Sequence, residues 1–292
     1  MIDLHTHTTA SDGTDTPAQI IENALAAGLE ALAITDHDTL LGSDEALPLA
    51  AARGLRLVRG LELSTRRSAD PAPECRSVHI LGYFFEEPAP AFRGWLETLR
   101  SERRTRNAGI SAKLAALGMP VELEEAEALG RNITSRPHFA RLMRDKGYVP
   151  TMQHAFDVYL GETGLAYVER ADPEPEEGIR RIREAGGIAS LAHAFRLNKR
   201  DPAEEESILA GFVQAGLGAI EVWHSDHDLS SRSRYTNLAK KFNLAMTGGS
   251  DYHGAHKPDV RLGRGRHSDW RVPLSVLDDL HARAVHAERR RQ

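Results

Sequence analysis

The chain contains 292 residues, of which 41% are hydrophobic and 27% are charged, and its formal net charge is -5. This composition is typical of a globular protein that buries a core without disulfides, and the negative total excludes a global basic field that draws in nucleic acid. The single cysteine, Cys75, excludes a disulfide framework and a thiolate metal site. We expect Cys75 to be an inert thiol.

The N-terminal residues carry neither a basic segment nor an apolar segment of the kind found in signal peptides. No apolar run approaches the roughly 20 residues that span a bilayer. We therefore expect a cytoplasmic protein without membrane contact. Nothing in the sequence implies an obligate protein partner.

Short β-rich runs recur along the chain, and most of them end next to a side chain that can ligate a metal. Helical patterns separate many of these runs, which predicts βα units and a largely parallel sheet. In (β/α) barrels the active site collects at the carboxyl ends of the strands, so the pattern favours a barrel. The expected strands cover residues 2–4, 31–35, 57–61, 78–84, 188–192, 220–223 and 244–247.

Two early helices are marked in the sequence, and one long stretch breaks the alternation. Thr16 with Gln19 predicts a capping box in front of a helix that ends at Gly28. A second helix is expected over about 43–53. Residues 92–164 are helical in pattern, with no convincing strand. We therefore predict a discontinuous barrel, 1–91 and 165–292, with an inserted helical cap subdomain, 92–164, beside its mouth.

The pair His5 and His7 is the strongest local signal for chemistry. Alternate residues of a strand point to the same face, so the two imidazoles lie close enough to share one metal. Such a pair alone is more often packing or surface. Other nitrogen and oxygen ligands of the kind that suits Mn²⁺, Fe²⁺ or Zn²⁺ stand within or at the ends of further strands. They are Asp36-His37-Asp38, Glu62, His79, His193 and Ser250-Asp251-Tyr252-His253.

Taken together, these motifs resemble the PHP (polymerase and histidinol phosphatase) family of phosphoesterases. The matching set runs from His5-Thr6-His7 with Asp12 to Ser250-Asp251-Tyr252-His253, over nearly the whole chain. The resemblance implies an α/β fold, a distorted (β/α)₇ barrel, and two to three divalent ions, for which Mg²⁺ is also compatible. One departure is Ala194, where many relatives have proline.

The resemblance also implies the role of each site residue. His5, His7, Glu62 and Asp251 would hold the first ion, and Glu62 would bridge to a second. His79 and His193 would complete the second group, while Asp12, His37 and His253 would hold a third ion. Asp36 would orient a ligand. A water or hydroxide bridging the metals would attack phosphorus, so no protein nucleophile is expected.

The expected cap contains a second group of polar residues, Thr134-Ser135-Arg136-Pro137-His138, directly before a helical pattern. A hydroxyl, a guanidinium and an imidazole this close can hold a phosphate, although the segment taken alone is more often a helix-capping serine beside a solvated arginine. It resembles the signature of one subgroup, which acts on nucleoside 3′,5′-bisphosphates and on the 5′ ends of short RNA. The resemblance places Ser135, Arg136, His138 and His227 near the substrate; His224 is a weaker candidate.

Three hypotheses follow. The leading one is hydrolysis of nucleoside 3′,5′-bisphosphates, such as 3′-phosphoadenosine 5′-phosphate, or of short 5′-phosphorylated RNA. The second is a histidinol-phosphate-type or other small phosphomonoester phosphatase. The third is a non-catalytic metal-binding regulatory module, which would be marked by missing ligands. The helix carrying Arg103 and Arg106 is either a solvated face or a wall of the nucleotide path.

Overall fold

The computed structural model describes residues 1–72, 75–130, 133–169, 171–198, 201–267 and 270–289. In this part of the chain seven strands form one sheet in sequence order. The hydrogen bond from Leu4 N to Gly248 O, 3.1 Å long, joins the end of the first strand to the last, so the sheet curls into a nearly closed barrel. The predicted distorted seven-stranded barrel is therefore confirmed. The strands are β1 (Ile2–Asp3), β2 (Ala31–Ile34), β3 (Arg56–Arg66), β4 (Ser77–Phe84), β5 (Ile188–Leu191), β6 (Ala219–Trp223) and β7 (Ala245–Gly248).

One strand runs against the others. β4 pairs antiparallel with both β3 and β5, whereas the remaining neighbours are parallel. The prediction of a largely parallel sheet thus holds outside β4. Because β4 is reversed, His79 near its beginning pairs with Ser64 near the end of β3. The reversal therefore brings His79 to the rim at which β3 carries Glu62.

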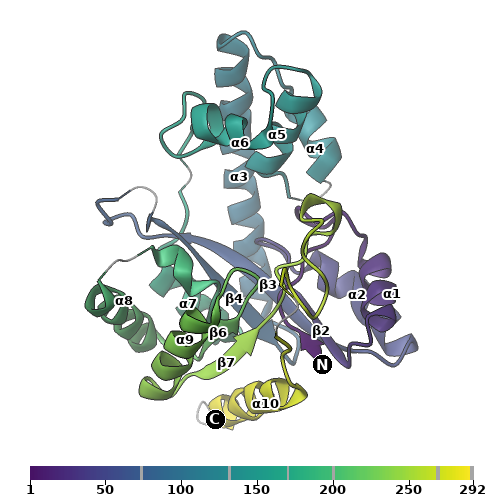
Figure 1. Ribbon diagram of the computed structural model, residues 1–292, viewed down its shortest axis with the longest axis vertical. Coiled ribbons are helices and arrows are strands. Elements are labelled where there is room, and N and C mark those ends of the chain that lie inside the picture. The colour runs from purple at the N-terminus through teal and green to yellow at the C-terminus, as the bar shows by residue number, and fades with distance from the viewer. Residues whose placement is uncertain (73–74, 131–132, 170, 199–200, 268–269, 290–292) are drawn as a thin grey trace.

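Helices pack on the outside of the barrel (Figure 1). Thr16 and Gln19 form the predicted capping box, and the second helix begins two residues before the predicted start. The last helix lies at the end of the barrel away from the inserted helices (Figure 1). The helices are α1 (Pro17–Ala26), α2 (Leu41–Ala52), α7 (Pro175–Glu184), α8 (Pro202–Ala215), α9 (Leu229–Lys241) and α10 (Leu274–Arg289), with two short turns of 3₁₀-helix, η3 (Ala194–Leu197) and η4 (Gly254–His256).

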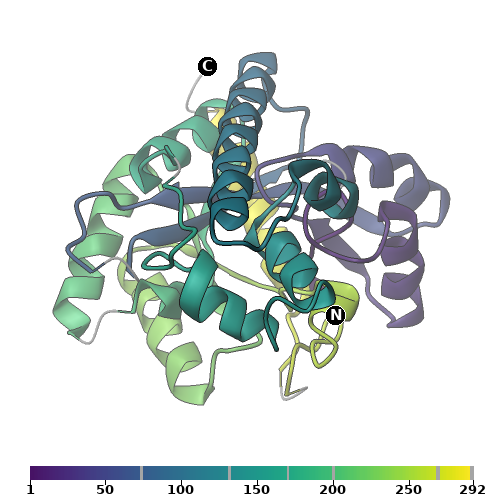
Figure 2. The same ribbon diagram turned by 90° about the horizontal axis from the view of Figure 1, so that it is seen from above.

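The stretch predicted as a cap is helical and stands above the rim of the barrel (Figures 1 and 2). The first half of its long helix buries Phe92 and Leu96 in the barrel core, while the second half buries Ile110 and Leu114 in a separate core. This long helix thus contributes to both cores. The boundaries of the cap subdomain, 92–164, stay a prediction. The helices are α3 (Pro90–Ala116), α4 (Leu123–Gly130), α5 (Arg136–Asp145), α6 (Met152–Ala155) and the π-helical η2 (Phe156–Leu160).

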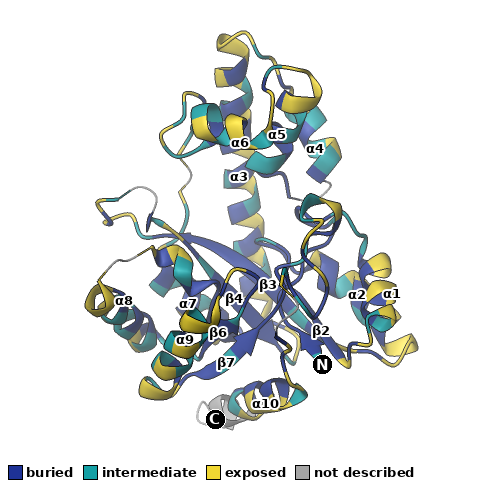
Figure 3. Cartoon of the chain, in the orientation of Figure 1, coloured by how far each residue is buried: buried dark blue, intermediate teal, exposed yellow. Residues whose placement is uncertain are grey.

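Burial differs between the strands and the helices that cover them. The strands are almost entirely buried, and the helices expose their outer faces (Figure 3). Buried polar residues gather at the strand ends, where His5, His7 and Glu62 are at most 1% exposed. None of the described helices is long and apolar enough to cross a lipid bilayer.

Candidate metal centre

The strand ends at the rim place the candidate ligands, and two of these ligands have unusual backbone. His193 has φ 28° and Asp251 has φ 58°, the left-handed region that non-glycine residues rarely adopt. Such strained backbone clusters at functional sites. Glu62 lies beyond the end of β2 on the longer β3 and forms a parallel bridge with His37. The fold therefore collects these side chains at one point.

The first group surrounds one oxygen of Glu62. Glu62 Oε2 is 3.1 Å from His5 Nε2 and 3.0 Å from His7 Nε2. Asp251 Oδ1 lies 3.6 Å and 3.5 Å from the same two nitrogens. These four residues offer ligand atoms that all lie within 4.8 Å of one another, close enough for a single ion.

The second group surrounds the other oxygen of Glu62. Its Oε1 atom is 2.7 Å from His79 Nδ1 and 2.8 Å from His193 Nε2. Glu62 therefore stands between two sets of imidazoles, one on each oxygen. This is the arrangement required of a carboxylate that bridges two ions.

The third group gathers around Asp12. Asp12 Oδ1 is 3.3 Å from His253 Nε2, and Asp12 Oδ2 is 3.6 Å from His37 Nε2. His7 Nδ1 lies 3.7 Å from Asp12 Oδ1. His37 Nδ1 also lies 3.4 Å from Glu62 Oε2, so His37 faces two groups at once. The structure thus brings all nine predicted ligands together.

The protonation states of Glu62, Asp12 and His37 suit divalent cations. Burial alone would raise the pKa of Glu62, but His37, His79 and His5 hold it well below the ordinary value. Burial alone would also raise the pKa of Asp12, but His37 and His253 hold that pKa well below the ordinary value. Both side chains are therefore anionic. Burial lowers the pKa of His37 to about 4, which keeps this imidazole neutral and able to donate a lone pair.

Unpartnered atoms point to the same conclusion. His7 Nε2 and His37 Nδ1 are buried 3.0 Å and 3.4 Å from Glu62 Oε2, yet neither nitrogen has the geometry of a hydrogen bond with any described residue. Buried polar atoms are nearly always paired, so two orphaned nitrogens facing carboxylate oxygens fit a bound cation. Nitrogen and oxygen ligands without sulfur suit Mn²⁺, Fe²⁺ or Zn²⁺. The residues present therefore fit divalent metal ions.

Asp36 lies behind these groups, and both of its carboxylate oxygens accept hydrogen bonds from the loop that follows His7. Its Oδ1 accepts hydrogen bonds of 2.7 Å from Thr8 N and from Ser11 Oγ, and its Oδ2 accepts one of 2.7 Å from Thr8 Oγ1. Ser11 Oγ lies 3.5 Å from His7 Nδ1. Asp36 thus orders the loop behind a ligand, and its predicted orienting role stays a prediction.

Glu221, which was not among the predicted site residues, is fully buried in β6 and contacts His5. Glu221 Oε1 lies 2.9 Å from His5 Nδ1, and its Oε2 accepts a 2.6 Å hydrogen bond from His193 N. A carboxylate in this place fixes the imidazole so that Nε2 faces Glu62 and Asp251, the residues with which His5 would hold an ion. The available signal was a carboxylate inside an otherwise apolar strand.

His224 and Lys257 contact the outer oxygen of Asp251. His224 Nδ1 accepts from Asp226 N at 3.1 Å, so in the neutral ring Nε2 carries the proton that faces Asp251 Oδ2 at 3.4 Å. Lys257 Nζ lies 2.6 Å from the same Oδ2. Asp251 therefore keeps Oδ1 directed at His5 and His7.

The substitution Glu221→Gln tests this support of the ligands. Gln cannot accept on both oxygen positions, so the His5 ring loses its fixed orientation, and we expect Mn²⁺ affinity to fall roughly 10- to 100-fold. Metal titration of the purified variant measures it. Glu205→Gln is the matched control, because Glu205 is also buried but contacts Arg234 and Tyr235 away from the site. Equal affinity in both variants would contradict the role of Glu221.

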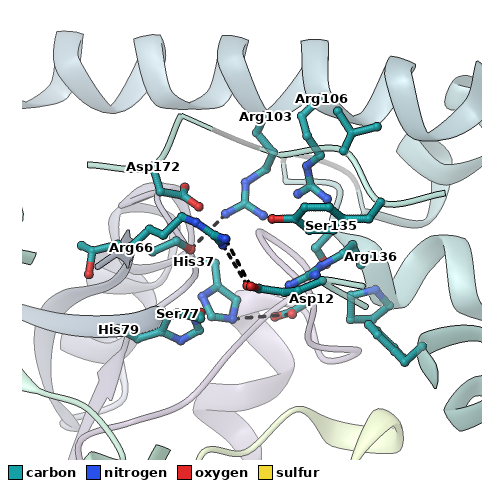
Figure 4. A pocket seen from close by; sticks show the side chains of 17 residues that line it. Asp12, His37, Arg66, Ser77, His79, Arg103, Arg106, Ser135, Arg136 and Asp172 are labelled. Carbon is teal, nitrogen blue, oxygen red and sulfur yellow. Dashed lines mark hydrogen bonds and ion pairs between the residues drawn. The ribbon is translucent and has the colours of Figure 1, made fainter. Parts of the chain in front are cut away.

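A cavity of about 220 Å³ opens beside the metal groups (Figure 4). Asp12, His37 and His79 form one wall, and four arginines, Arg66, Arg103, Arg106 and Arg136, reach it from the barrel and from the inserted helices. The cavity therefore joins the second and third metal groups to a cluster of guanidinium groups that can bind an anion.

The arginines of the cavity differ in their partners. Arg66 pairs with both oxygens of Glu162, and Arg103 contacts Asp38 and Ser64. Arg136 instead donates to the backbone carbonyl of Leu160 at 3.2 Å. Among the described residues, no carboxylate lies within 4 Å of Arg136, so its charge is available to an anionic ligand.

The other predicted substrate residues are placed differently. Ser135 lines the cavity, but His138 and His227 are not among the described residues that form its wall. His138 Nδ1 accepts a 3.0 Å hydrogen bond from Ser135 N and so caps α5. His227 Nδ1 lies 2.9 Å from Val222 O, and the centroid of its ring is 5.3 Å from that of His224. Substrate contact by these two histidines stays a prediction.

The model of the PHP domain family matches residues 3–149, half of the chain. A 5′-3′ exoribonuclease of Haemophilus influenzae is 34% identical over 86% of this chain and 89% of its own length. This chain belongs to the PHP domain family. The predicted family is confirmed.

Other relatives and solved structures extend the match within the PHP family. A phosphoribosyl 1,2-cyclic phosphate 1,2-diphosphodiesterase of Eggerthella lenta is 35% identical over 93% of this chain and 98% of its own length. A 3′,5′-nucleoside bisphosphate phosphatase of Chromobacterium violaceum is 34% identical over 86% of this chain and 87% of its own length. The structure of a Bifidobacterium adolescentis protein assigned as a metal-dependent phosphoesterase superposes with a TM-score of 0.82 at 29% identity, covering 97% and 96% of the two chains. This PHP chain is a metal-dependent phosphoesterase, a hydrolase.

Proposed function

We propose that this PHP enzyme hydrolyses phosphate esters in substrates that carry a second phosphate, above all nucleoside 3′,5′-bisphosphates and short 5′-phosphorylated RNA. The observation that carries the proposal is Arg136, a cation without a described carboxylate partner in a cavity shared with His37 and His79. A phosphate held by Arg136 lies beside metal groups that can hold the scissile phosphate. The names of the relatives from H. influenzae and C. violaceum support this substrate class.

The residues divide the work between metal binding and substrate positioning. The nine candidate ligands would hold Mn²⁺, Fe²⁺ or Zn²⁺. When bound, such ions acidify water and neutralise charge on phosphoryl oxygens. Glu62 keeps two groups at a fixed separation, and Glu221 keeps the His5 ring in place. Arg136 and Ser135 hold the second phosphate, so its binding energy positions the reacting ester.

The E. lenta relative favours a second candidate, a cyclic phosphodiester of phosphoribose. By its name, that substrate also carries a phosphate besides the cyclic one, so the cavity chemistry serves both candidates. The two candidates differ in the bond broken and in the presence of a nucleobase. A small phosphomonoester such as histidinol phosphate lacks the second phosphate and leaves Arg136 without an anion.

A phosphate-release screen tests the proposal. The Mn²⁺-loaded enzyme is assayed on adenosine 3′,5′-bisphosphate, AMP, short 5′-phosphorylated RNA and histidinol phosphate. Opening of phosphoribosyl 1,2-cyclic phosphate is followed separately, because hydrolysis of only one of its two cyclic ester bonds opens the ring without releasing free phosphate. We expect kcat/KM for the bisphosphate or the RNA to exceed that for AMP by roughly ten- to a hundredfold, the worth of one charge-assisted hydrogen bond. Preference for AMP or histidinol phosphate would overturn the proposal, and preference for the cyclic ester would select the second candidate.

A further inference from the structure

His256 lies between the barrel and the inserted helices, three residues after the candidate ligand His253. Its Nδ1 is 2.8 Å from the backbone carbonyl of Asp12, another candidate ligand. Its Nε2 is 3.4 Å from Arg141 Nη1 on α5. One side chain thus contacts the loop that carries a metal ligand and the helix that begins with Arg136.

The chemistry of the two partners fixes the state of the ring. A carbonyl only accepts, so His256 Nδ1 carries the proton. A guanidinium only donates, so Nε2 offers its lone pair. A neutral imidazole satisfies both contacts at once. A side chain with a single polar end can contact either the Asp12 carbonyl or Arg141, but not both at once.

Both ends of this contact sit on ordered structure. On the barrel side, the segments around Asp12 and His256 are joined by hydrogen bonds from Thr14 N to His253 O, 3.2 Å, and from Ala255 N to Thr14 Oγ1, 2.8 Å. On the other side, Arg141 belongs to the same helix as Arg136. A shift at His256 is therefore transmitted to Arg136 through a single helix.

Other ties between the barrel and the inserted helices reach different walls of the cavity. Arg103 on α3 contacts Asp38 after β2, and Arg66 on β3 pairs with Glu162 after η2. Arg141 reaches the barrel from α5 itself. The contact with His256 thus bears most directly on the distance between Arg136 and the metal groups.

We propose that His256 is a positioning residue that couples the phosphate-holding helix α5 to the Asp12 metal group. The inference rests on the proposed function, in which Arg136 holds the second phosphate. Misplacing a substrate contact by about 1 Å costs up to a hundredfold in rate. Loss of one partly exposed contact at 3.4 Å should cost less, about three- to tenfold.

Four variants separate the two halves of the contact. Arg141→Ala removes the half on α5. His256→Asn keeps a side-chain N–H for the Asp12 carbonyl, but its shorter side chain does not at the same time bring an acceptor to Arg141, and His256→Ala removes both halves. Arg144→Ala is the matched control, because Arg141 and Arg144 both contact Asp145 while Arg141 alone of the two reaches His256.

Steady-state kinetics show whether each variant changes KM or kcat. We expect Arg141→Ala and His256→Asn to raise KM for adenosine 3′,5′-bisphosphate about three- to tenfold, with a smaller effect on kcat and unchanged Mn²⁺ content. His256→Ala should also weaken Mn²⁺ binding, by about tenfold, because the Asp12 loop loses its support. Arg144→Ala should match the unchanged protein in both measurements.

Hydrogen exchange gives a readout that needs no substrate. Amides in the first turns of α5 should exchange faster in Arg141→Ala and His256→Asn than in Arg144→Ala. If that difference is present while the enzyme prefers a monophosphate, the coupling stands and the proposed substrate class fails. If Arg141→Ala matches Arg144→Ala in exchange and in KM, the coupling is overturned whatever the substrate is.

Discussion

Glu62→Ala should leave the enzyme without measurable turnover and with at least one metal ion fewer per chain. Both oxygens of Glu62 are engaged, Oε2 by His5 and His7 and Oε1 by His79 and His193. The substitution therefore removes a ligand from two groups at once. Metal analysis by mass spectrometry and a phosphate-release assay measure both effects on one preparation.

Glu62→Gln serves as the control for folding. It keeps the volume of the side chain but replaces one oxygen by an amide nitrogen, which cannot ligate a metal. We expect Glu62→Gln to fold, as judged by circular dichroism, and still to lose metal and activity. Unchanged metal content with normal turnover in either variant would rule out a central role for Glu62.

Arg136→Ala should lower kcat/KM for adenosine 3′,5′-bisphosphate roughly ten- to a hundredfold, and the loss on AMP should be smaller. The reason is the loss of a hydrogen bond to a charged group, worth about 1.5–3 kcal/mol. Metal content should stay unchanged, since Arg136 is outside the metal groups. Steady-state kinetics on the two nucleotides and metal analysis of the variant give the comparison.

Two further variants define what Arg136 contributes. Arg136→Lys keeps the charge without the planar fork of donors, so part of the preference for the bisphosphate should return. Arg104→Ala removes a surface arginine of α3 that pairs with Glu127, and it should have no effect. An equal loss on both nucleotides in Arg136→Ala would refute the two-phosphate site and favour a small phosphomonoester.

Several candidate ligand positions were predictable from the sequence because they follow from a local rule. Apolar runs that end at His5 or His193 predict strand ends, and parallel strand ends meet at one rim. Thr16 with Gln19 likewise predicts a capping box from four residues. Such features need no knowledge of distant contacts.

Other features depend on contacts between distant segments. The reversal of β4 leaves no trace in the alternation of apolar residues, which is the same for parallel and antiparallel strands. Glu221 is defined by its contact with His5, 216 residues away. Arg66 is held at the cavity by an ion pair with Glu162, which lies 96 residues later in the chain. The single helix α3 contributes residues to two separate hydrophobic cores.

The most direct test of the account is a crystal structure of the Mn²⁺-loaded protein with anomalous difference maps recorded at the manganese edge. We expect one peak between His5, His7, Glu62 and Asp251, and a second beside His79 and His193 on the other oxygen of Glu62. A third peak, where occupied, belongs at Asp12, His37 and His253. A single peak away from Glu62, or one at Glu221 and His224, would contradict the bridging role of Glu62 on which the account depends.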